Sequence, residues 1–189
     1  KRKREPIPKN AKCISVLHVL KNGIVDYGSL IRYEPKYPGV RCYPDDVLIS
    51  KINPHISRVL VVPDYGFATT CSSEFEVLAP REGIDPYELA VLLTIDPVHR
   101  QLSRAVSGTS SSHRRIKSDS LAEILIPVID PNGPLAASYQ TLIKTQRKTM
   151  APLNQLVKDA EKCREQIEVL FNTPDQDEDT QPTDQSETA

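Results

Sequence analysis

The sequence predicts an α+β (mixed α/β) domain followed by a long α-helical, coiled-coil-like region. Two observations carry this prediction. Short runs of β-branched and apolar residues, separated by Pro, Gly and Asn, fill residues 13–78. Residues typical of the amino terminus of a helix, Asp85-Pro86, follow them. Residues 136–171 then show helical periodicity among dense charges. With 189 residues, 39% of them hydrophobic, the chain has room for one ordinary domain and an extension.

The expected organisation has four parts: a basic lead-in over 1–12, a folded domain over 13–131, a helical region over 132–171 and a disordered acidic tail over 172–189. All 24 Lys and Arg residues precede the tail together with 19 of the 25 acids, so residues 1–171 carry a net charge of +5. The chain has no apolar run long enough for a membrane span and no signal-like amino terminus. We therefore expect a cytoplasmic protein without a membrane partner.

The first half of the domain reads as strands and loops. Residues 13–20 predict a short helix or strand, residues 24–31 a strand, and residues 33–43 a loop rich in tyrosine and cations. Four further strands are predicted over residues 46–52, 57–62, 66–70 and 73–78.

The second half of the domain is predicted to be mainly helical. Asp85-Pro86 has the residue order of a helix start and is followed by leucines at helical spacing. Residues 97–106 predict a second helix, and Ser118 to Leu121 a capped helical turn. Residues 124–127 predict a strand that closes the domain.

Two helices are predicted in the carboxy-terminal region, over residues 136–148 and 152–171, because Pro152 is tolerated only in the first turn of a helix. The second helix has apolar residues at alternating four- and three-residue steps, which we term the heptad seam: Leu153, Leu156, Ala160, Cys163, Ile167 and Leu170. A seam this short requires a partner, either a second copy or another subunit. The alternative is a helix folded back on its own domain.

The most distinctive polar stretch lies between the second helix and the closing strand. It supplies hydroxyls, an imidazole and cations with no carboxylate among them: Thr109, Ser110, Ser111, Ser112, His113, Arg114, Arg115 and Lys117. Hydroxyls and amides position a nucleic-acid backbone, and arginine forms a bidentate pair with guanine in the major groove. The stretch indicates contact with phosphate or DNA. A solvated basic loop is the alternative.

No catalytic or metal-binding motif stands out. A methyltransferase would need a glycine-rich cofactor loop and an Asn/Asp-Pro-Pro-Tyr-type motif, and a serine hydrolase a Gly-x-Ser-x-Gly elbow; the sequence has none of these. The carboxylates of a nuclease motif occur only in reversed order. The scattered cysteines, Cys13, Cys42, Cys71 and Cys163, predict reduced thiols and no metal site. We expect a non-enzymatic protein without a cofactor.

The order of several short motifs resembles the target recognition domain of type I restriction-modification specificity subunits. These motifs are Asp45 to Pro54, Ser72 to Leu78, Tyr87-Glu88-Leu89, Ser107-Gly108-Thr109 and Ile124 to Pro127. The resemblance covers residues 13–128, and the helical region after them is similar to that family's spacer helix. It implies a target recognition domain with a curved β-sheet followed by a coiled-coil-like spacer.

The resemblance also implies a function, that of a non-catalytic reader of double-stranded DNA. In the family, one recognition domain reads half of a split target. Helices set the distance to the other half and dock the adenine-N6 methyltransferase subunits, which link it to a restriction or translocase subunit. The residues implied to face DNA are Lys51, Asn53, His55, Arg58, Thr109, Ser110, Ser111, Ser112, His113, Arg114, Arg115 and Lys117. Arg114 or Arg115 is expected on guanine or phosphate, and Lys51, Arg58 and Lys117 on phosphates.

The chain departs from the family in size, because a full specificity subunit usually holds two recognition domains and two spacer helices. Three expectations stay open: a fragment, a half-subunit that forms a homodimer through the heptad seam, and the specificity end of a methyltransferase fusion. A homodimer would read an interrupted palindrome, and a helix of about 20 residues spans about 30 Å, close to the ~34 Å of one DNA turn. The rival functions are an interaction or regulatory module without specific DNA binding and a metal-dependent nuclease.

Overall fold

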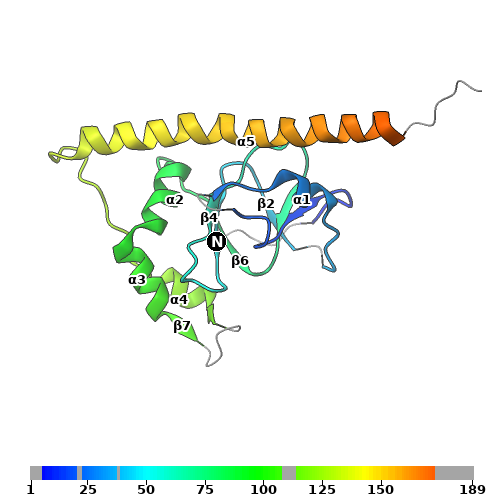
Figure 1. The fold of residues 1–189 in the computed structure, drawn as a ribbon. Helices are drawn as coiled ribbons and strands as arrows, with labels where there is room; N and C mark the ends of the chain where they lie inside the picture. The colour runs from blue at the N-terminus through cyan, green and yellow to red at the C-terminus, as the bar shows by residue number, and fades with distance from the viewer. Residues whose placement is uncertain (1–5, 21–22, 38, 108–113, 173–189) are drawn as a thin grey trace, which may run out of the picture.

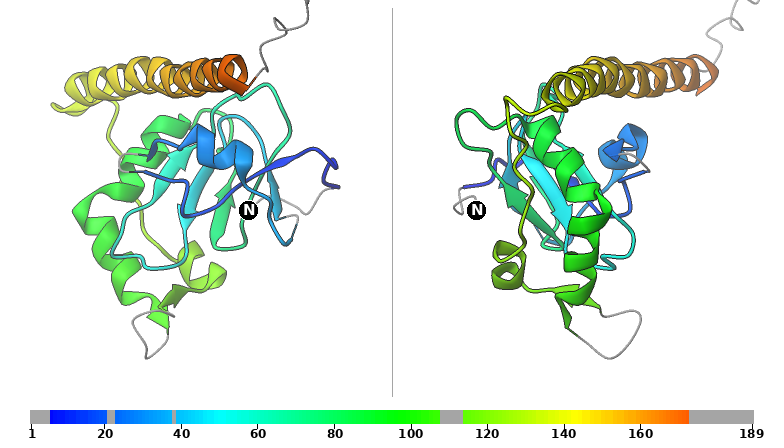
Figure 2. Two further views of the ribbon diagram at one scale, coloured as in Figure 1. Left: turned by 45° about the vertical axis from the view of Figure 1, so that its right-hand side comes forward. Right: turned by 90° about the vertical axis from the view of Figure 1, so that its left-hand side faces the viewer.

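A mixed α/β domain lies against one long helix, α5 (Ala136–Asn172), which crosses one side of it (Figures 1 and 2). The computed structural model describes residues 6–20, 23–37, 39–107 and 114–172. The expected mixed α/β fold with a long carboxy-terminal helix is confirmed. Among the described residues, no helix has both the length and the apolar character that crossing a bilayer requires.

The central layer of the domain is an antiparallel sheet with β3 (Val47–Ser50) in the middle, between β4 (Val59–Val61) and β6 (Phe75–Leu78). All four residues of β3 are buried, because successive side chains point to opposite faces and both faces are covered. Leu48 enters one hydrophobic cluster, while Val47 and Ile49 enter the other. β3 is therefore the strand on which both halves of the core meet.

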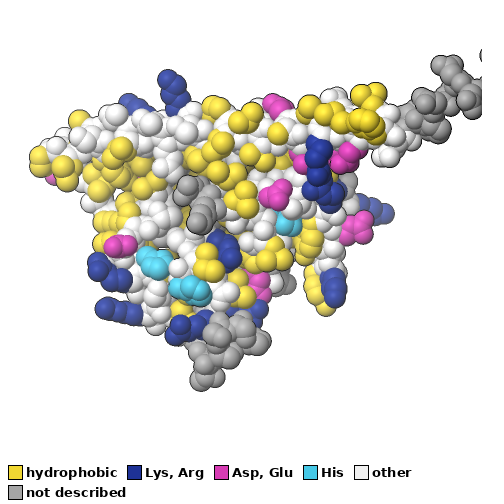
Figure 3. All heavy atoms as spheres, in the orientation of Figure 1, with side chains coloured by type: hydrophobic (Ala, Val, Ile, Leu, Met, Phe, Trp, Pro, Cys, Tyr) yellow, Lys and Arg dark blue, Asp and Glu magenta, His cyan; other side chains and the backbone are white. Residues whose placement is uncertain are grey.

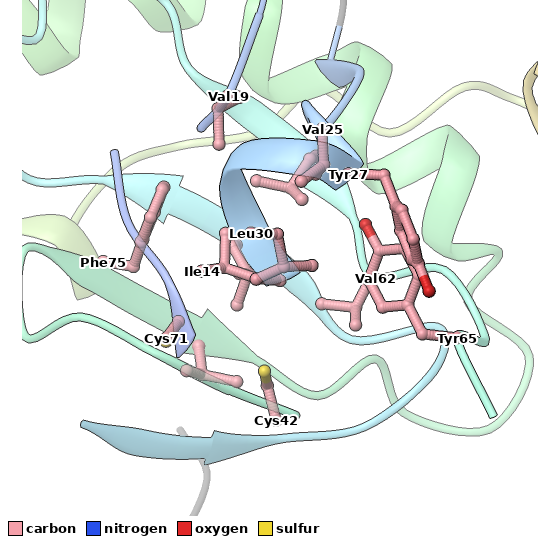
Figure 4. Packing of buried hydrophobic residues seen from close by; sticks show 13 residues of the cluster. Ile14, Val19, Val25, Tyr27, Leu30, Cys42, Val62, Tyr65, Cys71 and Phe75 are labelled. Carbon is pink, nitrogen blue, oxygen red and sulfur yellow. The ribbon is translucent and has the colours of Figure 1, made fainter. Parts of the chain in front are cut away.

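A second small sheet covers one face of this layer. Its order is β1 (Lys12–Ile14), β5 (Thr69–Cys71) and β2 (Val40–Cys42), with β1 parallel and β2 antiparallel to β5. Together with α1 (Tyr27–Arg32) it closes the first cluster, in which Ile14, Leu30 and Val62 pack against one another (Figure 4).

Helices cover the other face of the central layer: α2 (Pro86–Thr94), α3 (Asp96–Arg104) and α4 (Ser118–Ala122). α2 begins where the sequence predicts, because the Asp85 carboxylate accepts the Tyr87 and Glu88 backbone N–H groups at 2.8 and 3.3 Å. A short antiparallel ribbon, β7 (Val106–Ser107) and β8 (Arg115–Ile116), follows α3. The β-structure is thus divided among two small sheets and one ribbon.

Three predicted elements differ in the structure. The strand expected over residues 24–31 is wrong, because Asp26 caps helix α1 there by accepting the backbone N–H of Ser29 at 3.0 Å and its hydroxyl at 2.7 Å. The loop expected over 33–43 contains β2 at its end. The strand expected over 124–127 is absent from that described segment, where the Gln101 side-chain amide bonds both the N–H and the carbonyl of Leu125 at 2.9 Å.

The predicted break at Pro152 is also wrong, because α5 runs through it as one helix of 37 residues. Pro152 cannot donate to the Lys148 carbonyl, but both residues are exposed, so water can satisfy that oxygen. At about 1.5 Å per residue the helix is about 55 Å long. It exceeds the expected second helix of about 30 Å because the two predicted helices are continuous.

Candidate nucleic-acid interface

Two segments that the sequence singles out separately lie side by side. Beyond β3, the Asn53 backbone N–H donates to the Arg114 carbonyl at 3.1 Å, and the Ile116 N–H donates to the Lys51 carbonyl at 2.9 Å. Ile52 and Arg115 form an antiparallel bridge between these bonds. The end of the central strand thus anchors the start of β8, although more than 60 residues separate them along the chain.

Helix α3 closes one side of this junction. His99 Nε2 lies 2.9 Å from the Pro54 carbonyl oxygen, and because a carbonyl only accepts, Nε2–H donates. β7 then leads from α3 directly into the ribbon, where Val106 pairs with Ile116. We call α3, residues 51–58, the ribbon and its flanking residues Arg114 and Lys117 together the ribbon end; it lies on the opposite side of the domain from α5 (Figure 1).

Two of the predicted DNA-facing cations are held by acids of β6 and the residue before it. The Arg115 guanidinium makes a two-bond contact with Glu74, at 2.9 Å from Nε and 2.6 Å from Nη2. The hydrogen bonds and charge of Glu74 raise the pKa of Arg115. Lys51 Nζ lies 3.5 Å from a Glu76 oxygen that also accepts the Ser118 hydroxyl at 2.6 Å. These side chains bind the ribbon end to the sheet.

Other cations of the ribbon end have no such acidic partner among the residues that the structure describes. Within the described part of the chain, no ion pair is formed by Arg58, Arg100, Arg104, Arg114 or Lys117. All of these except the half-buried Arg58 are exposed, as is the predicted His55. Figure 3 shows Lys, Arg and His side chains gathered over this end of the molecule.

Sequence reasoning missed the two α3 arginines. Their signal is their four-residue spacing in a helix whose Val98 and Leu102 are buried, which directs the arginines outward. Among the predicted loop residues, Thr109, Ser110, Ser111, Ser112 and His113 lie outside the described residues.

Three of the four cysteines lie inside the domain. Cys13, Cys42 and Cys71 are buried and unbridged, while Cys163 is exposed on α5. Burial raises the pKa of Cys13, and a hydrogen bond with Cys71 followed by burial raises that of Cys42, so neither is a reactive thiolate. In the segments that the structure describes, no three His, Cys, Asp or Glu side chains gather to hold a metal ion.

Helix α5 meets the domain through a stripe different from the heptad seam. Ile143 is its one buried residue in the described range, and Val157 packs against the first cluster. The seam faces solvent over much of its length, with Leu156 64%, Ile167 48% and Leu170 75% exposed. A largely apolar groove of about 790 Å³ runs between the amino-terminal half of α5 and the β4–α2 surface.

Ion pairs fix both halves of α5. Arg147 binds Asp85 at 2.6 Å and lies over the Tyr87 ring, 5.3 Å from its centroid. Further along, Glu161 pairs with Arg32 of α1 and with Arg164. Burial acts to raise the pKa of Glu161, but the hydrogen bonds from these two arginines lower it below its ordinary value. Gly28 permits this approach, because a Cβ there would lie 2.6 Å from the Glu161 carboxylate.

Comparison with known proteins identifies the fold. No protein-family model and no curated protein sequence matches the chain. The crystal structure of an HsdS subunit from Thermoanaerobacter tengcongensis matches 91% of the chain, with a TM-score of 0.53 and 17% sequence identity. A chain from a structure of a type I restriction-modification system, described in terms of its assembly and conformational transition, matches the same share with a TM-score of 0.51 and 18% identity. The present chain spans 45% of each of these chains.

Proposed function

We propose that this chain is a DNA sequence-recognition component of a type I-like restriction-modification system. It reads one half-site of duplex DNA in the cytoplasm and docks an adenine-N6 methyltransferase subunit, without catalysis of its own. The fold likeness to HsdS over nearly the whole described chain carries the proposal. It agrees with the independent sequence resemblance over residues 13–128.

The ribbon end supports the assignment of the DNA-facing side. It brings Lys51 and Asn53, predicted in one loop, together with Arg114, predicted in another, and it carries cations without acidic partners among the described residues. Phosphate contacts of this kind orient a protein on a duplex, and each good bidentate base contact contributes about 1–3 kcal/mol of discrimination. Arg114 is our candidate for a base or phosphate contact.

The exposed heptad seam supports a second part of the proposal, homodimerisation through α5. Apolar side chains such as Leu156 and Leu170 at heptad spacing lose water contact only when another helix covers them. Because the chain spans less than half of the HsdS chains, two copies related by a two-fold axis would supply two recognition domains. The target would then be a palindrome interrupted by unread base pairs.

The test is selection from a pool of randomised duplexes by the purified protein at low and moderate salt, with its mass in solution measured in parallel. We expect enrichment of a two-part palindrome by a dimer. If selection fails both alone and with the methyltransferase present, the DNA-reading function is wrong. The exposed seam then favours the alternative, an interaction module that binds a protein partner through α5.

A further inference from the structure

The outward face of α3 is a cationic stripe that the predicted site did not include. Arg100 and Arg104 lie four residues apart with Ser103 between them, and all three are exposed. The opposite face holds Val98 and Leu102, which are buried in the second cluster. Helical periodicity therefore places the two guanidinium groups and the hydroxyl together on one stripe of the helix.

We propose that this stripe, Arg100, Ser103 and Arg104, binds the phosphate backbone of the duplex beside the loops that read bases. The inference rests on the proposed function and deepens it, because it adds phosphate contacts from a helix to those proposed for the residues around the ribbon. It also separates cations that face DNA from cations that hold the domain together.

The position of α3 suits this role. Its Arg104 lies two residues before β7, so the stripe leads directly into the ribbon whose other strand carries Arg115. The His99 bond to the Pro54 carbonyl fixes the helix against the strand-end loop. A contact on α3 would therefore be rigidly placed relative to Arg114 and Asn53, as phosphate contacts that set register must be.

The local charge favours the binding of an anion at the α3 stripe rather than at the side of the ribbon end that faces Glu74 and Glu76. The sole carboxylate of α3 is Asp96 at its first residue, one turn from Arg100 and about 12 Å along the axis from Arg104, and among the described residues it forms no ion pair with either arginine. By contrast, a phosphate next to Arg115 or Lys51 would have to approach Glu74 and Glu76. Repulsion from these carboxylates opposes binding on that side.

The spacing also fits a nucleic-acid backbone. Arg100 and Arg104 are one turn apart, about 6 Å along the axis, so they can each take one phosphate of the same strand. Each guanidinium offers paired N–H donors to phosphate oxygens, and the exposed Ser103 hydroxyl beside them is a further donor. Arg104 in the last turn also stabilises α3 through the helix dipole, a role that requires neither Arg100 nor DNA.

The experiment compares two double variants of the full chain. Arg100→Gln with Arg104→Gln removes the stripe, whereas Lys144→Gln with Lys148→Gln removes a matched pair of exposed cations, also four residues apart, on α5. Affinity for a short labelled duplex is measured by fluorescence anisotropy over a salt series. If the stripe variant loses two phosphate contacts, the negative slope of log K against log salt becomes shallower by about 2. Its affinity at about 0.1 M salt then falls roughly 50-fold. The α5 control keeps the wild-type slope.

Thermal melting of every variant completes the test. A reduced slope with a preserved melting curve supports the inference. A stripe variant that melts earlier but keeps the wild-type slope overturns it, because Arg104 then acts only on the helix dipole. If the wild-type chain fails to bind any duplex at low salt, with or without the methyltransferase, the proposed function fails first and this inference falls with it.

Discussion

The α5 side and the ribbon end of the domain use their charges in opposite ways. Along α5, Arg147 is paired with Asp85, the N-cap residue of α2, and Glu161 with Arg32 of α1, so charge serves to dock the helix. At the ribbon end, Glu74 and Glu76 hold Arg115 and Lys51, but the cations of α3 and Arg114 meet no acid among the described residues. The difference teaches that positive charge in this chain separates into a structural set and a set available to an anionic ligand.

The largest expected effect comes from the seam of α5. Leu156→Asp with Ile167→Asp places two charges where a second helix would bury them, and burying an unpaired carboxylate costs far more than the seam contributes. We expect the dimer to be lost and the mass in solution to fall by half, as measured by sedimentation. The Arg147 and Glu161 contacts lie outside the seam, so the monomer should keep its fold. An unaltered mass would mean that the seam makes no contact between copies.

The next effect tests how firmly α5 is docked. Ile143 is 5% exposed, and Ile143→Ala should lower the free energy of unfolding by about 2 kcal/mol, the low end for such truncations because the site borders the groove. The neighbouring Leu142 is 66% exposed, so Leu142→Ala should change it by less than about 0.5 kcal/mol. Urea denaturation measures both. Equal effects would show that α5 is not packed on the domain in solution.

A third prediction separates the two neighbouring arginines of the ribbon end. Arg114→Ala should lower the salt slope of DNA binding by about 1 together with affinity, because released counterions scale with phosphate contacts. Arg115→Ala should keep the slope and instead lower the melting temperature, because it leaves Glu74 without its partner. Changing both residues should combine the two effects. A lower slope for Arg115→Ala alone would place that guanidinium on DNA.

The smallest effect concerns acid pH at α5. The pKa of Glu161 is lowered in the folded chain, so its stabilising contribution is fully present above the unfolded pKa and is lost as pH falls through the lower folded value. We expect amide exchange in the carboxy-terminal half of α5 to speed up in that acidic range. Glu161→Gln should exchange faster already at neutral pH and should lose this acid dependence. Identical pH profiles for the two proteins would argue against a role for Glu161 in docking.

Local chemistry explains what could be predicted of the fold. β3 could be predicted because a short run of apolar and β-branched residues is typical of a strand, and the structure buries this run on both faces. α2 could be predicted because Asp85-Pro86 is a strong start signal for a helix. α1 was missed because its apolar residues read as a strand, although Asp26 and Ser29 have capping spacing. The continuity of α5 through Pro152 depends on packing along its whole length, which no local rule at proline contains.

The candidate site could be predicted in its residue types but not in its arrangement. The bonds of Lys51 and Asn53 to the start of β8 span more than 60 residues, and the Arg115–Glu74 contact spans 41. Whether a cation is paired or exposed depends on such distant neighbours. Arg100 and Arg104 were not among the predicted site residues, because the outward direction of their side chains follows only from the burial of Val98 and Leu102 in the second cluster.

Pro152 gives α5 a mechanical property. The turn at Pro152 lacks the backbone hydrogen bond to the Lys148 carbonyl, and a turn without this bond bends more easily than an intact helical turn. Arg147 just before this turn and Glu161 two to three turns after it both form ion pairs with the domain, so the turn is held in place on both sides. Bending is thereby shifted to the eleven residues from Lys162 to Asn172, which are all exposed and extend beyond the domain (Figure 2). Under the proposed function, α5 is a spacer helix that is rigid where it lies on the domain and flexible only at its carboxy-terminal end.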